Sequence, residues 1–109
     1  VKDDIKIRDT HCVIEIKRGT AKEEDILQTL KYVDWLKNEY TGQDYSSIKA
    51  FLIAFKFSEK VKEIGKKVAK RTYLVGSNPI RSMEWSDFKL ITYNYNSNTG
   101  QLEFRDVTD

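Results

Sequence analysis

The sequence contains a single cysteine, which excludes an internal disulfide bond. A chain without disulfides suits a reducing compartment, and we therefore expect a cytoplasmic protein. One cysteine and one histidine offer too few ligands for a zinc site. The sequence also lacks a P-loop, a dinucleotide-binding fingerprint and a Ser-His-Asp set, so these three kinds of chemistry are not indicated.

Long apolar runs are also missing. No stretch reaches the ~18 residues of a membrane-spanning helix, and no signal-peptide pattern opens the chain. The 109 residues suffice for one small domain, residues 1–109, with its own core. With 33% charged and 39% hydrophobic residues, the composition is typical of a folded chain. The net charge of +2 neither requires nor excludes nucleic acid, so a basic surface must come from local clustering.

The segment 11–19 (HCVIEIKRG) alternates with the period of a β-strand. Glu15 and Lys17 therefore stand side by side on one face. The other face carries Cys12, which we expect to be a small core residue. A carboxylate beside a lysine on a rigid strand can hold a hard divalent cation and position a water. An edge strand with a solvated face shows the same pattern, so both interpretations stay open.

The segment 3–8 alternates as well and predicts a β-hairpin with the strand that follows. With a loop of even length, Asp4 faces Glu15, and like charges ~5 Å apart destabilise a strand pair. A divalent cation between the two carboxylates would turn this repulsion into attraction. The neighbouring Lys6 and Lys17 offset the repulsion in the alternative without a metal.

A capping-box pattern that starts at Thr20 predicts a helix to about Tyr40. At ~100° per residue, this helix carries two stripes on nearly opposite sides, one aliphatic and one aromatic with an amide. Their residues are Ile26, Leu30 and Val33 in the first and Gln28, Tyr32 and Trp35 in the second. The second stripe either lines a site beside the hairpin or makes a second core contact.

The rest of the chain predicts a mixed α/β order. The apolar run 48–55 indicates a central strand covered on both faces. Ser58 can cap a helix to about Arg71 whose lysine-rich back is expected to be solvated. A strand over 72–75, a loop over 76–87 and a hairpin of 88–95 with 101–107 complete the order. We therefore expect one sheet with the helices packed on it.

Taken together, these motifs resemble the PD-(D/E)XK nuclease superfamily. The sequence shows Asp4, then Glu15-Ile16-Lys17, then a Gln28-x-x-x-Tyr32 element of the kind found in RecB-like members. It is similar to the C-terminal nuclease domain of NucS-type endonucleases, and the resemblance covers roughly residues 4–75. No proline precedes Asp4, and the family's first helix has no counterpart ahead of it, so we expect a domain that lacks its N-terminal helix.

The resemblance implies a restriction-endonuclease-like mixed central sheet flanked by two helices, with a C-terminal β-hairpin. It also implies a DNA endonuclease dependent on Mg²⁺ or Mn²⁺, held by Asp4, Glu15 and the backbone carbonyl of Ile16. Lys17 would orient a water or stabilise the phosphate. Gln28 and Tyr32 would hold the site or touch the nucleic acid. Phosphate contacts are expected from Lys6, Arg8, Arg18 and Lys31.

Two alternatives remain open. The first is a nuclease-fold module that binds DNA or protein without cutting. The second is a structural domain whose hairpin charges are incidental. We expect no membrane partner, and a homodimer and a larger parent chain are both compatible with the sequence.

Overall fold

The computed structural model describes residues 10–40 and 45–108 as a mixed α/β structure. The elements are β1 (His11–Thr20), α1 (Glu23–Glu39), β2 (Ile48–Lys56), α2 (Glu59–Val68), β3 (Arg71–Val75), β4 (Arg81–Trp85), β5 (Phe88–Asn96) and β6 (Gln101–Asp106). The predicted fold class, a mixed sheet flanked by two helices and ending in a β-hairpin, is confirmed. Neither of the described helices combines the length and the apolar character needed to cross a membrane.

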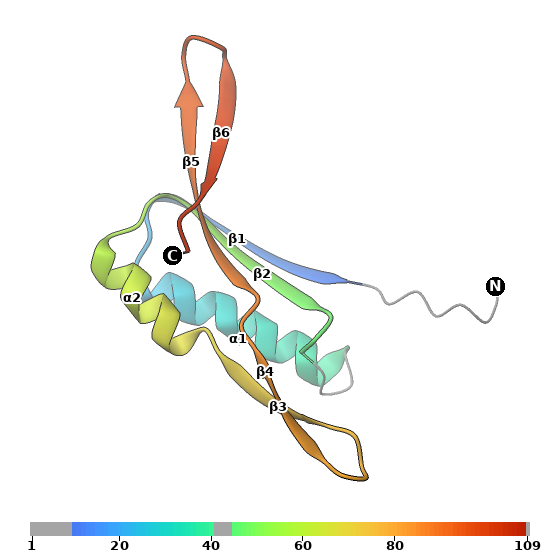
Figure 1. Cartoon of the computed structure of the whole chain (residues 1–109). Coiled ribbons are helices and arrows are strands. Elements are labelled where there is room, and N and C mark those ends of the chain that lie inside the picture. Colours follow the sequence, from blue (N-terminus) through green and yellow to red (C-terminus); the bar gives the residue numbers. More distant parts are fainter. Residues whose placement is uncertain (1–9, 41–44, 109) are drawn as a thin grey trace, which may run out of the picture.

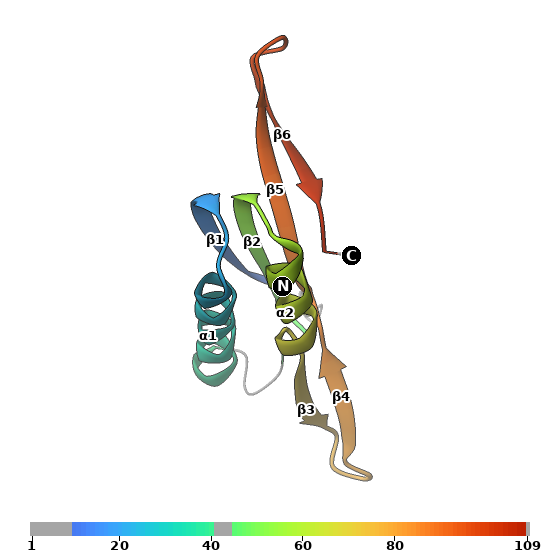
Figure 2. The ribbon, with the colours of Figure 1, turned by 90° about the vertical axis from the view of Figure 1, so that its left-hand side faces the viewer.

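The main sheet has the strand order β1-β2-β5-β6, which makes β2 a central strand as expected. β1 and β2 run parallel, β2 and β5 run parallel, and β5 and β6 form an antiparallel hairpin. Parallel neighbours need a crossover connection, and α1 supplies the first of these. Both helices cover the same face of the sheet (Figures 1 and 2).

The core lies between this face and the two helices. The aliphatic stripe of α1 is buried as predicted and packs with the β2 side chains that alternate towards it. A Cβ atom on Gly65 of α2 would lie 3.4 Å from Ile26 Cδ1 and 3.5 Å from Leu90 Cδ1. Gly65 therefore marks the place where α2 packs against both α1 and β5, and a methyl group there would make ordinary van der Waals contacts.

The prediction of a loop over 76–87 is wrong for residues 81–85, because Arg81–Trp85 forms β4 and pairs antiparallel with β3. The turn between these strands and the two residues Ser86 and Asp87 are irregular, and the second hairpin that the strands form projects from the body of the protein (Figure 1). Trp85 anchors it. The indole is 4% exposed, and its Nε1 donates a hydrogen bond to the Ile48 carbonyl oxygen over 2.8 Å.

Helix boundaries follow local capping. Thr20 is the last residue of β1, paired with Lys56, so the prediction that it caps α1 is wrong. Lys22 occupies the N-cap position instead. The predicted cap of α2 is confirmed, since the Val61 N–H donates to Ser58 Oγ over 3.2 Å. α2 stops at Val68, earlier than expected, because the chain enters β3 soon afterwards.

The far face of the sheet corrects two further expectations. Cys12 is exposed on this face and is not a core residue. β2 is covered on its helix side only, since Phe55 remains 54% exposed. Among the described elements none packs against the far face (Figure 2).

Candidate functional site

Glu15 and Lys17 lie on the side of β1 that faces the helices, as the alternation predicts. Val13 on the same side is buried in the core, while Glu15 and Lys17 are half-buried at its margin. Glu15 lies beside Leu52 of β2, and Lys17 lies beside Ala54. The rigid sheet therefore positions a carboxylate and an ammonium group next to each other, close to α1.

Asp25 joins these two residues from the first turn of α1. Its Oδ2 atom lies 3.8 Å from Lys17 Nζ and accepts a hydrogen bond from the Lys22 backbone N–H over 2.8 Å. Asp25 was not among the predicted site residues. The signal was an acidic residue three positions after the N-cap, in a helix that begins directly after the strand.

A shallow pocket of about 360 Å³ opens beside Glu15, between β1 and α1. Its lining includes Glu15, Tyr32 and Trp35. Within the described part of the chain, the Glu15 carboxylate accepts no hydrogen bond and forms no ion pair. A half-buried acid without a protein partner, next to open space, has room for a ligand.

The aromatic stripe of α1 borders this pocket. Tyr32 is 47% exposed and also lines a second hollow, of about 380 Å³, together with Gln28 and Lys31. Tyr32 therefore connects the surroundings of Glu15 to Gln28. Trp35 is half exposed and packs edge-on against Tyr40, with ring centroids 5.3 Å apart. The alternative interpretation, in which Trp35 makes a second core contact, is therefore wrong.

The other predicted site residues are less closely associated. Asp4, Lys6 and Arg8 lie outside the described residues. Arg18 is exposed, and the alternation of β1 sends its side chain away from that of Lys17. In the ranges 10–40 and 45–108, no three His, Cys, Asp or Glu side chains gather in a way that could hold a metal ion. A complete cation site would therefore require a ligand from outside these ranges, and Asp4 is the predicted one.

A second polar cluster lies at the other end of α1. Arg71 at the start of β3 binds Asp34 with two hydrogen bonds, Nε to Oδ1 over 2.8 Å and Nη2 to Oδ2 over 3.1 Å. The Tyr45 hydroxyl donates to Asp34 Oδ1 over 2.9 Å. Burial, followed by the hydrogen bond to Asp34, raises the pKa of Tyr45 to about 12. This cluster ties β3 to α1 and is structural.

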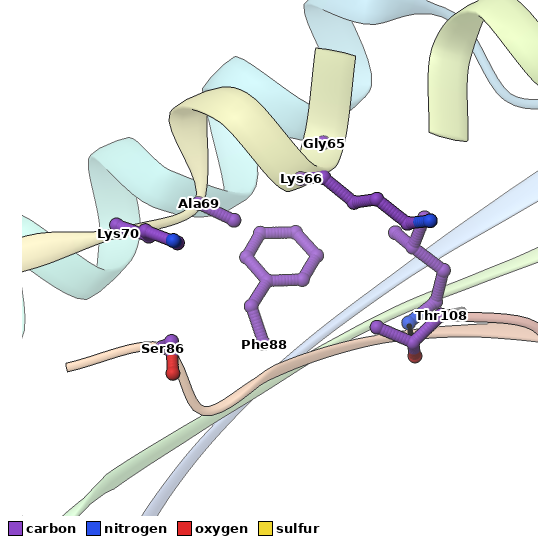
Figure 3. Close-up of a pocket in the computed structure, with 8 residues that line it drawn as sticks. Gly65, Lys66, Ala69, Lys70, Ser86, Phe88 and Thr108 are labelled. Atoms are coloured by element: carbon purple, nitrogen blue, oxygen red, sulfur yellow. Dashed lines mark hydrogen bonds between the residues drawn. The ribbon is translucent and has the colours of Figure 1, made fainter. Parts of the chain in front are cut away.

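A larger pocket, of about 420 Å³, lies on the α2 side of the molecule (Figure 3). The Phe88 ring stands at its centre, with Lys66 on its α2 side and Thr108 on its sheet side. Thr108 Oγ1 accepts a hydrogen bond from the Leu90 N–H over 3.0 Å, which closes the sheet side of the pocket. The pocket belongs to α2 and β5, so it is separate from the surroundings of Glu15 on β1.

Comparison of the chain with protein-family models, with curated proteins and with solved structures gives no significant match. The nuclease family stays a prediction from the motifs, and the function has to be argued from the site itself.

Proposed function

We propose that this chain is the core of a metal-dependent nuclease that hydrolyses phosphodiester bonds in DNA. The observation that carries the proposal is the arrangement of Glu15, Lys17 and Tyr32. A half-buried carboxylate without a described protein partner stands beside an ammonium group, and the carboxylate lines a pocket together with a tyrosine of α1.

The donor set fits a hard divalent cation. Carboxylate and carbonyl oxygens are the ligands that Mg²⁺ and Mn²⁺ prefer, and Mg²⁺ keeps several waters, so few protein ligands suffice. Glu15 would supply one carboxylate, Ile16 its backbone carbonyl, and Asp4 the second carboxylate. A bound cation lowers the pKa of a coordinated water and neutralises phosphate charge.

Lys17 would stabilise the negative charge that develops on the phosphate. Its Nζ atom lies 3.8 Å from Asp25, and the Lys17 side chain is 36% exposed. Such a long, partly solvated ion pair contributes little free energy. The ammonium group can therefore turn from Asp25 towards a bound phosphate at low cost.

The path of the DNA would follow α1. Gln28, Lys31 and Tyr32 line a continuous exposed strip next to the Glu15 pocket. A lysine and two uncharged polar side chains favour contacts to phosphate and sugar, which give affinity without sequence specificity. Arg18 points to the opposite side of β1 and fits this path poorly.

A cleavage assay tests the proposal. The longest natural form of the chain is incubated with mixed single- and double-stranded DNA and Mg²⁺ or Mn²⁺. We expect metal-dependent cleavage that falls about 10²–10³-fold in Glu15→Gln and in Lys17→Ala. Glu84→Gln, the same chemical change on the exposed strand β4, is the matched control and should cut like the wild type.

The second candidate is a nuclease-fold module that binds DNA or protein without cutting. The observation in its favour is that, among the described residues, no three His, Cys, Asp or Glu side chains gather around Glu15 to hold a metal ion. DNA binding without cleavage in either metal would support this module. If the chain neither binds nor cuts DNA, the purely structural alternative is correct.

A further inference from the structure

The far face of the sheet carries large apolar side chains on all four strands. Six of them are more than half exposed: Ile14, Ile16, Phe55, Tyr95, Leu102 and Phe104. The pairing of β5 with β6 continues the face onto the β5–β6 hairpin. The rings of Phe55 and Tyr93 are in contact, with centroids 6.0 Å apart. The six side chains thus belong to one surface, which we call the far face.

The far face is unusually large for a protein that acts alone. Monomeric proteins rarely expose an apolar patch of more than a few hundred Å², and a half-exposed aromatic side chain presents on the order of 100 Å². Three aromatic and three aliphatic side chains of this exposure present on the order of 600 Å², which is about three quarters of the ~800 Å² per partner of a standard protein–protein interface. The six side chains would therefore form most of such an interface.

The printed sequence contains little else that could cover this surface. The residues outside the described ranges include only three large aliphatic side chains, Val1, Ile5 and Ile7. A second copy of the chain brings an apolar face of the same size. Two sheets pack face to face at ~10 Å through such surfaces, and a two-fold axis makes the same patch self-complementary.

The charges on the far face are compatible with this arrangement. Lys49 and Lys89 are exposed near the starts of β2 and β5, at the end of the sheet remote from the β5–β6 hairpin. Two sheets stacked head to tail around a two-fold axis place these lysines at opposite ends of the interface, away from the same lysines of the other copy, while the apolar centres meet. Arg18 also points to the far face, but it stands on the edge strand β1 and so lies at the margin of such an interface.

We propose that the far face is a homodimer interface formed by sheet-on-sheet packing. Glu15 and Lys17 lie on the helix side of β1, so the dimer would present two candidate sites on opposite outer surfaces. The proposal is independent of whether those sites cut DNA, since it uses only the far face.

Sedimentation velocity of the 109-residue chain over a range of concentrations tests the proposal. We expect a species of twice the 12.8 kDa mass of one chain. Ile16→Glu and Phe104→Glu should each weaken dimerisation on the order of 30-fold or more. Leu74→Glu, at an aliphatic residue of β3 that is 68% exposed, is the matched control and should leave the dimer intact. Circular dichroism checks the fold of each variant.

Cys12 provides a second readout that needs no introduced cysteine. It is the one cysteine in the sequence, and it is exposed on the far face. A spin label there should report a defined distance between copies, which Ile16→Glu removes. A chain that stays monomeric at all concentrations overturns the proposal, including a monomer whose far face binds detergent or another protein. A dimer that Leu74→Glu disrupts as strongly as Ile16→Glu also overturns it.

Discussion

Lys17 Nζ lies 3.8 Å from the Asp25 carboxylate, which also accepts a hydrogen bond from the Lys22 backbone N–H. One acidic side chain therefore holds the start of α1 and lies next to the lysine of the candidate site. Only two residues separate the end of β1 from the start of α1. The geometry of the site therefore depends on how this helix is capped.

Replacement of Asp25 tests its role in capping the start of α1. Asp25→Ala removes the acceptor at the helix start, and we expect a loss of about 1 kcal/mol in the free energy of unfolding. Asp25→Asn keeps an acceptor oxygen and should cost less. Urea denaturation measures both, with Glu24→Ala as the control because Glu24 is exposed in the same turn. Equal stability of Asp25→Ala and Glu24→Ala would contradict the capping role.

The raised pKa of Tyr45 predicts that the folded state loses stability at high pH. Burial and the hydrogen bond to Asp34 raise its pKa from 10.0 to about 12. The neutral hydroxyl is thus favoured in the folded state, and its contribution to stability is complete below pH ~10 and disappears as the pH rises through about 12. An absorbance titration should show one tyrosine that ionises later than the others.

Asp34→Asn should lower the pKa of Tyr45 without returning it to the ordinary value, because burial, the larger cause, remains. Tyr45→Phe should abolish the late ionisation step, which would assign this step to Tyr45. If the wild type shows no late step, Tyr45 is neither buried nor hydrogen-bonded to Asp34 in solution.

Tyr32 should affect function without affecting stability. Its ring is 47% exposed, so Tyr32→Phe should change the free energy of unfolding by less than about 0.5 kcal/mol. If the hydroxyl contacts DNA or the scissile phosphate, cleavage should fall about tenfold or more. Tyr40→Phe, at an exposed tyrosine of similar environment, should cut normally. Equal activity of the two variants would remove Tyr32 from the site.

The sequence predicts the parts of this structure that depend on local periodicity. Alternation alone places Glu15 and Lys17 on the same side of β1, and the 3.6-residue period correctly identifies the stripe of α1 that is buried. Alternation does not say which side of a strand faces the core, and this is why Cys12 was placed inside.

Contacts between distant segments were not predictable in this way. Asp34 and Arg71 are 37 positions apart, and neither residue carries a local signal of the pairing. β4 was missed because four of its five residues are exposed, so it lacks the apolar alternation that marks a half-buried strand. Its pairing with β3 and the burial of Trp85 define it instead.

The central claim is that Glu15 helps to hold a divalent cation, and a calorimetric titration with Mn²⁺ tests it most directly. The longest natural form of the chain should bind Mn²⁺ saturably. Binding should be lost or strongly weakened in Glu15→Gln and retained in Lys17→Ala, because only the first variant removes a negative charge from the cation site. Glu84→Gln should bind like the wild type. Absence of Mn²⁺ binding in the wild type, or equal binding in Glu15→Gln, would contradict the account.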